Sequence, residues 1–340
     1  MRYVGLDVHK EFCQASVLDE KGFELGNERF PTTQGGLESF LERFDEASFV
    51  LESTGVWEFV YEIIEAKGFP VKLAHPLKVR AIAEASVKTD KVDARTLAKL
   101  LRLDMVPESY IPPKDIRDLR RLTRLRSYLT RTNTGYKNRT HADLLARGIR
   151  RPEGMNVPFS QKSQDWMRSL DIHGVDVQLN VIEAVQGQIE MVNRFIQEEF
   201  DRREEVRNLT SIPGIGMFSA MVIFAEIGEV HRFPDAEHLC SYAGLTPTVS
   251  QSASSCHYGG ISKEGSKQLR WILTEAVYSH VRFEPDSNLS KFYDKIARKK
   301  GKQKAAMAAA RKLLHIIYWM MWNNEVYHSH GFNPVLKPAA

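Results

Sequence analysis

The sequence predicts an α/β domain built on a mixed sheet, then a helical and coiled-coil connector, then a mostly α-helical domain. Short apolar runs alternate with helically spaced segments up to about residue 105. A proline-rich break at 107–113 precedes a long stretch with helical spacing, and helical patterns dominate again from residue 209. We therefore expect domains at 1–106, 107–206 and 207–330, with a tail at 331–340.

The first domain is expected to alternate strands with helices. Apolar runs at 3–8 and 13–18 could pair as a hairpin, and the run SFVL at 48–51 is typical of a buried strand. The other expected elements are a helix at 57–66, a strand at 71–74, and helices at 77–85 and 92–103.

The connector is expected to contain two long helices. Residues 114–151 hold twelve Lys or Arg against three Asp, and a stripe of leucines gives the helix one apolar face. Four arginines lie largely off this stripe and are candidates for nucleic-acid contacts: Arg117, Arg121, Arg124 and Arg131. Residues 182–196 carry apolar side chains at coiled-coil spacing, over a seam short enough to suit a hairpin within the chain or a dimer.

The composition excludes several classes of protein. Of 340 residues, 43% are hydrophobic and 26% charged, so neither disorder nor a fibrous repeat is indicated. The three cysteines are far apart without a CxxC pair, which argues against a disulfide framework or a zinc ribbon and fits a reducing, cytosolic setting. The most apolar stretch, 313–322, is too short to span a bilayer, so we expect no membrane anchoring.

Four acids are candidate metal ligands. Asp7 and Glu52 each fall at the end of an expected strand, and Asp90 and Asp93 share one face of a helix start. Each alone is typical of a turn former, a helix cap or a solvated first-turn acid. Together, their strand-end placement favours a cluster that needs a cation, and oxygen ligands select Mg²⁺ or Mn²⁺.

Three further segments could serve a nucleic acid. In IPGIG at 212–216, Gly214 and Gly216 would allow a helix-hairpin-helix that grips phosphates, or simply a turn between helices. The serine- and glycine-rich stretch at 241–265 is expected to be a loop, with a possible nucleophilic serine and the nearby cations Lys263, Lys267 and Arg270. A basic run at 295–304, which includes Lys299 and Lys300, gives a second basic surface.

These segments together resemble a known family, the DEDD insertion-sequence transposases (insertion-sequence family one-ten), which are related to the Piv and MooV DNA invertases. The resemblance covers nearly the whole chain. It rests on GLDVHK at 5–10, LESTG at 51–55, KTDKVDARTLA at 88–98, IPGIG at 212–216, YAGLTP at 242–247, ISKEGSKQLR at 261–270 and AARKLL at 309–314.

The resemblance implies a RuvC-like (RNase H-like) domain in which Asp7, Glu52, Asp90 and Asp93 hold the metal. It also implies a C-terminal transposase domain with a nucleophilic serine, and the matching position is Ser252. The stretch TVSQSASSCHYGG departs from the arginine-containing version of the family, and Ser250, Ser254 and Ser255 lie close by. The family further implies DNA partners, a guide RNA encoded by the element, a dimer or tetramer with a composite site, and a bacterial or archaeal cytoplasm close to the nucleoid.

The implied reaction is DNA strand cleavage and exchange through a covalent phosphoserine. One alternative is a junction-resolving nuclease that uses water at the same acids. A sugar-kinase or actin-like ATPase would need a second phosphate motif, which the sequence lacks. A non-enzymatic nucleic-acid-binding protein would have no need of all four acids.

Overall fold

The computed structural model describes residues 1–82, 89–252 and 255–328. The chain divides into two compact units, Met1–Ile111 and Pro112–Ala340. The first is an α/β unit and the second is almost entirely helical, which confirms the expected combination of a mixed sheet with many helices.

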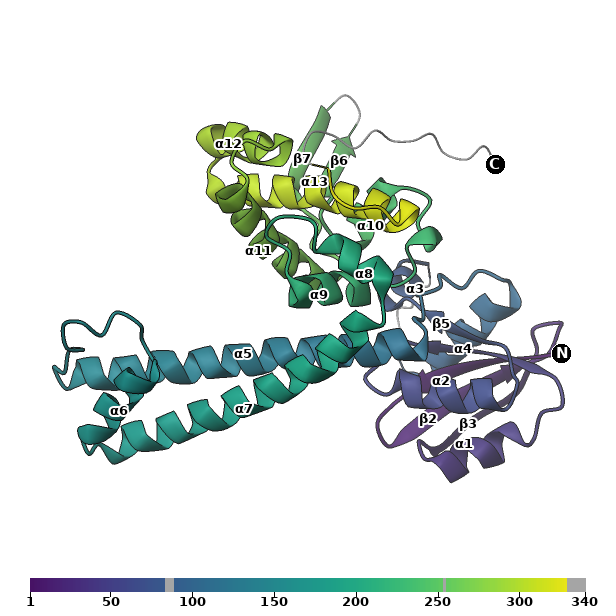
Figure 1. The fold of residues 1–340 in the computed structure, drawn as a ribbon. Coiled ribbons are helices and arrows are strands. Elements are labelled where there is room, and N and C mark those ends of the chain that lie inside the picture. The colour runs from purple at the N-terminus through teal and green to yellow at the C-terminus, as the bar shows by residue number, and fades with distance from the viewer. Residues whose placement is uncertain (83–88, 253–254, 329–340) are drawn as a thin grey trace. The chain divides into compact units, whose positions relative to one another are not determined.

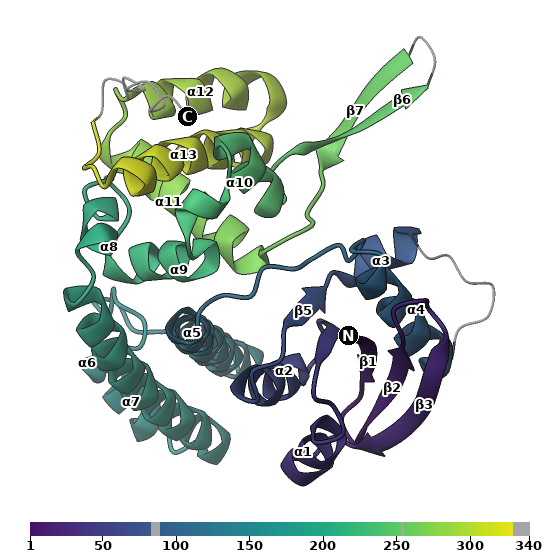
Figure 2. The same cartoon turned by 90° about the vertical axis from the view of Figure 1, so that its right-hand side faces the viewer.

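The first unit is a five-stranded mixed sheet in the order β3-β2-β1-β4-β5 (Figures 1 and 2). β1 pairs antiparallel with β2 and parallel with β4; β2 continues antiparallel to β3 and β4 parallel to β5. The strands are β1 (Arg2–Val8), β2 (Phe12–Leu18), β3 (Glu24–Pro31), β4 (Ala47–Glu52) and β5 (Val71–Ala74), and the helices are α1 (Gln34–Leu41), α2 (Trp57–Ala66), α3 (Pro76–Ile82) and α4 (Asp90–Arg102).

Alternation along the strands gives the sheet two buried faces. Val4 and Leu6 of β1 pack with Leu37 of α1 and Val60 of α2. Val50 of β4, on the opposite face, packs with residues of α3 and α4. The helix expected at 77–85 is therefore α3 up to Ile82, and its last three positions lie outside the described residues.

The second unit opens with two long helices that pack side by side, α5 (Lys114–Ala146) and α7 (His173–Asp201), joined by α6 (Gln161–Ser169) (Figure 1). Apolar residues of the coiled-coil seam, among them Ile182 and Ile196, are fully buried within this one chain. Of the two interpretations of the seam, the hairpin within the chain is therefore present.

The remaining helices build one core with α13 (Lys302–Asn323), which contributes nine of its 22 residues to that core. They are α8 (Glu204–Leu209), α9 (Met217–Ile227), α10 (Ala236–Tyr242), α11 (Lys267–Phe283) and α12 (Asn288–Lys300), with a 3₁₀ turn at Val230–Arg232. Across the described parts of the chain, no helix has both the length and the apolar character that crossing a bilayer requires.

The expectation of a loop at 241–265 is wrong. β6 (Pro247–Ser252) and β7 (Ser255–Ile261) form an antiparallel hairpin that extends from the helices of this unit (Figure 2). Two strands can pair through their backbones whatever their side chains, so a serine-rich composition does not prevent a ladder.

Candidate active site

Asp7 and Glu52 are brought together by the register of two parallel strands. Leu6 of β1 lies opposite Leu51 of β4, so the two acids are the next residues along adjacent strands. Partners in a parallel ladder point to the same face of the sheet. The two carboxylates therefore stand side by side where β1 and β4 end.

Helix α4 reaches this face because β1 has a glycine there. A Cβ on Gly5 would lie 2.1 Å from the carbonyl oxygen of Ala94 and 2.4 Å from the amide nitrogen of Ala98. Gly5 and Asp7 share one face, since side chains alternate along a strand. This close approach of the α4 backbone directs the start of α4, with Asp90 and Asp93 in its first turn, toward Asp7.

His9 and Arg29 are also part of the cluster, although no pattern in the sequence predicted either of them. Nε2 of His9 lies 3.1 Å from Oδ2 of Asp7 and 3.6 Å from Oδ1 of Asp90. Nη2 of Arg29 lies 3.1 Å from Oδ2 of Asp90. His9 belongs to the GLDVHK segment, which is the signal that could have identified it. Arg29 comes from β3 and has no local signal.

The acids of the cluster influence one another's protonation, as the pKa of Asp7 shows. Burial raises the pKa of the Asp7 carboxyl, Asp90 and Asp93 raise it further by repulsion, and His9 opposes the rise. Ligand atoms of Asp7, His9 and Asp90 all lie within 4.8 Å of one another, close enough to share an ion. Half-buried carboxylates that repel one another are stabilised by a divalent cation, so the donor set fits a metal centre.

Ser252 is the last residue of β6 and lies opposite Ser255 of β7 in the hairpin. Its side chain, like those of Ser250, Ser254, Ser255 and His257, lies outside the described residues. The structure therefore gives the nucleophile candidate a place on the backbone only.

The glycines of IPGIG have different surroundings. The segment joins α8 to α9, as a helix-hairpin-helix would. Gly214 has a φ of +94°, and a Cβ there would lie 2.7 Å from the backbone nitrogen of His280, so α11 covers that side. Gly216 is exposed, and a Cβ on it would meet nothing within 4 Å.

The arginines expected to contact nucleic acid differ in their burial and in their partners within the protein. Arg117 is buried and donates from Nη1 to the carbonyl of Pro112 at 3.0 Å. Arg121 pairs with Asp118 at 2.7 Å on the surface. Arg131 is exposed.

The lysines predicted to contact nucleic acid are all exposed: Lys263, Lys267, Lys299 and Lys300. Arg270 donates from Nη1 to the carbonyl of Ala243 at 2.9 Å, so part of its side chain holds the turn before β6.

A buried acid, Glu226, binds Arg124 of α5 and Ser266 at the start of α11. Its side chain is 1% exposed and accepts both Nε and Nη2 of Arg124, at 2.7 and 2.9 Å. Ser266, the residue that caps α11, donates its hydroxyl to the same carboxylate at 2.9 Å. No pattern in the sequence predicted Glu226, because its partners are far away along the chain.

Replacing Glu226 by Gln is expected to destabilise the second unit by about 2 kcal/mol, because charge-assisted hydrogen bonds of a buried carboxylate are lost. The Arg124 side chain is 55% exposed, and water screens it, so a larger loss is not expected. Urea denaturation checks the change. Asp118→Asn, at an exposed ion pair, is the control and should stay within about 0.5 kcal/mol of the parent. Equal losses of stability in the two variants would contradict a stabilising role for the buried Glu226 carboxylate.

Sequence comparisons identify the family to which the chain is similar. A transposase family model for DEDD transposases of the IS110 type matches residues 4–147, which include all four acids. A second model, of the IS116/IS110/IS902 transposase family, matches residues 206–294. The chain is thus a DNA transposase or recombinase, an enzyme.

Three relatives match this chain over nearly the whole length of both proteins. The chain is 24% identical to a transposase for insertion sequence element IS1111A of Coxiella burnetii, over 96% of this chain and 91% of the relative. It is 25% identical to the transposase of IS1328 from Yersinia enterocolitica, over 95% and 98%. It is 26% identical to a pilin gene-inverting protein of Moraxella bovis, over 96% and 97%. The chain belongs to the IS110 family of insertion-sequence transposases.

Proposed function

We propose that this protein moves an insertion sequence by cutting and rejoining DNA through a phosphoserine intermediate. The α/β unit is proposed to be RuvC-like, with Asp7, Glu52, Asp90 and Asp93 as ligands of Mg²⁺ or Mn²⁺. The observation that carries the proposal is the meeting of strand-end acids with the first turn of α4, together with the raised pKa of Asp7. The second unit would divide into a connector up to residue 206 and a transposase domain from 207 to 330.

The proposed reaction is a pair of transesterifications. Oγ of Ser252 attacks the scissile phosphorus, the bond from phosphorus to the 3′ oxygen breaks, and the serine proton ends on that oxygen. The 3′ hydroxyl of the partner strand then attacks the phosphoserine and releases the serine. No net energy input is needed, because the ester bond is conserved. A bound divalent cation would supply electrostatic stabilisation of the phosphate charge that develops.

The acids and the serine act in a composite site in this proposal, with the acids of one protomer facing the serine of another, in a dimer or tetramer. Target choice would come from a guide RNA encoded by the element. The RNA would bind through shape and phosphate contacts to the basic face of α5, where Arg121 and Arg131 are exposed.

The test is a cleavage assay with purified protein, flanking RNA of the element, DNA and Mg²⁺, resolved on a denaturing gel before and after protease. A protease-sensitive DNA adduct is expected from the parent and none from Ser252→Ala, with Ser254→Ala and Ser255→Ala as matched controls. Cleavage without an adduct that persists in Ser252→Ala would establish water as the nucleophile instead. A second assay omits the RNA. Cleavage that is unchanged without RNA would contradict the proposal that a guide RNA selects the target.

A further inference from the structure

The second unit has a cavity of about 740 Å³ between α5 and α11 that the proposed reaction does not use. This volume falls in the range of roughly 300–1,000 Å³ that small-molecule sites occupy. One wall is a face of α5 that presents Arg120, Arg124 and Arg131, and the other is the first turns of α11 with Lys267 and Trp271.

The cavity is strongly basic, and its charges are of two kinds. Glu226 is the one acid among the described residues that line it, and its carboxylate accepts hydrogen bonds from Arg124 and Ser266. Arg120 donates from Nη2 to the carbonyl of Glu226 at 2.8 Å. Two cations are left, Arg131 and Lys267, which are exposed and make no ion pair among the residues described.

The cavity also has an aromatic wall in a fixed place. The Trp271 side chain is 42% exposed, although its neighbours Leu269, Ile272 and Leu273 anchor α11 in the core. Gln268 donates to the hydroxyl of Ser127, which ties the two walls together. A base that stacks on this exposed indole would cause little loss of side-chain entropy, because the helix already holds the indole in place.

We propose that this cavity binds one unstacked nucleotide of a nucleic-acid strand, with its base against Trp271 and its phosphate on Arg131 and Lys267. A phosphate alone would use the cations but not the indole, and an apolar ligand would leave the cations unsatisfied. A nucleotide satisfies both, because every base has a π-face and every nucleotide carries a phosphate. The inference rests on the proposed function, which requires strands to be opened for exchange.

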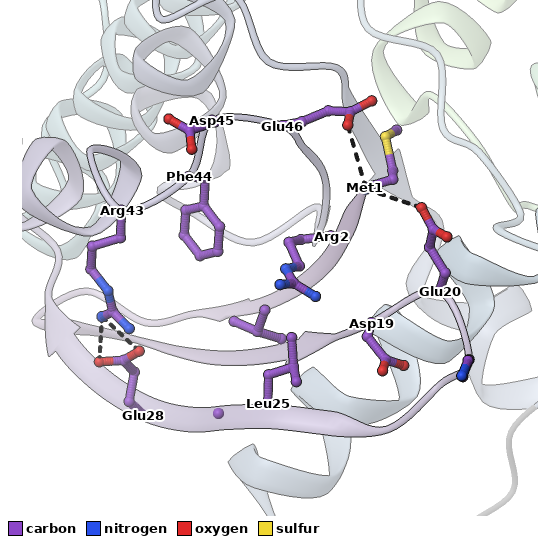
Figure 3. A pocket seen from close by; sticks show the side chains of 13 residues that line it. Met1, Arg2, Asp19, Glu20, Leu25, Glu28, Arg43, Phe44, Asp45 and Glu46 are labelled. Carbon is purple, nitrogen blue, oxygen red and sulfur yellow. Dashed lines mark hydrogen bonds and ion pairs between the residues drawn. The ribbon is translucent and has the colours of Figure 1, made fainter.

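A second cavity, of about 650 Å³, does not share these properties (Figure 3). It lies at the other end of the sheet from the four acids, where β1 begins. Its lining holds five acids, Asp19, Glu20, Glu28, Asp45 and Glu46, and three of them form ion pairs there: Arg43 with Glu28 at 2.7 Å, and the amine of Met1 with Glu20 at 3.1 Å and Glu46 at 3.4 Å. Its two other cations, Arg2 and Lys21, therefore share the cavity with several carboxylates, whereas Glu226 is the single acid among the described residues that line the cavity beside Trp271.

The test compares two labelled duplexes in the presence of a chelator, by fluorescence anisotropy. One contains a single unpaired adenosine, and the other an abasic unit at the same place. The parent protein should bind the adenosine bulge about 5- to 100-fold more tightly, the range expected for stacking of one base. Trp271→Ala should lose this preference and Trp271→Phe should keep most of it. Arg131→Ala with Lys267→Ala should weaken binding of both duplexes.

The matched control is Tyr278→Ala, which removes another 42% exposed aromatic ring from the same helix, outside the cavity, and should leave the preference intact. Equal binding of the two duplexes by the parent, or a preference that survives Trp271→Ala, would overturn the inference. Efficient competition by free deoxyadenosine monophosphate would assign the cavity to a mononucleotide and also overturn it. If the parent cleaves DNA with Mg²⁺ yet shows no preference, the inference alone fails; if it neither cleaves nor discriminates, the proposed function fails with it.

Discussion

Asp7→Asn is expected to lower metal-dependent strand cleavage by about 10³-fold or more, because the Asp7 carboxylate, at the centre of the cluster, is proposed to hold the cation that stabilises the transition state. Asn has nearly the same size and keeps one oxygen, so the fold should persist. The measurement is the initial rate of cleavage with saturating Mg²⁺. Asp45→Asn is the control, because Asp45 is an exposed acid of the same unit that lies away from the cluster.

The same variant should not lose stability, and the sign follows from the pKa. Burial and the nearby acids raise the pKa of Asp7, so the folded state binds this proton more tightly than the unfolded chain does. The stability from this group is complete below the unfolded pKa and is lost as pH rises through the folded pKa. Asn stays uncharged at every pH, so the variant does not undergo this loss.

Thermal melting checks this second result. Without metal, Asp7→Asn should melt no lower than the parent at neutral pH. Mg²⁺ should stabilise the parent by binding the folded state, and should stabilise Asp7→Asn much less. A variant that melts well below the parent in chelator, or that keeps near-parental cleavage, would contradict the metal role of Asp7.

Gly5→Ala is expected to destabilise the α/β unit by about 3 kcal/mol or more, from overpacking at a site that cannot relax. The added methyl would lie 2.1 and 2.4 Å from backbone atoms of α4, which no rotamer change can move. β1 is held by β2 on one side and β4 on the other, so it cannot retreat within the sheet. Only α4 can yield, and that would withdraw Asp90 and Asp93 from Asp7 and lower cleavage as well.

Hydrogen–deuterium exchange is the suitable measurement, because the two units need not unfold together. Peptides from β1 and α4 should exchange faster in Gly5→Ala, while those of the second unit should not change. Gly26→Ala is the matched control: it lies on β3 of the same sheet, and a Cβ there meets nothing within 4 Å. Unchanged exchange in α4 of Gly5→Ala would show that the close approach does not hold the helix.

The sequence by itself determined the local elements and the family. Alternating and helical spacing specify which residues face a core, so the strands at 3–8, 48–51 and 71–74 and the long helices of the connector could be predicted. The positions of Asp7 and Glu52 at strand ends follow from the same pattern. Motif spacing over nearly the whole chain indicated a transposase of this family, and two family models confirm it.

Only the tertiary structure decided which distant residues meet. His9 lies between Asp7 and Asp90, and Arg124 pairs with Glu226 102 residues away, through contacts that no local pattern records. The hairpin of β6 and β7 was missed because its ladder is made by backbone groups, which composition does not report. Local periodicity depends on neighbouring residues, whereas the geometry of a site depends on how closely separate elements pack. At Gly5, the absence of a side chain is what allows α4 to approach β1 so closely.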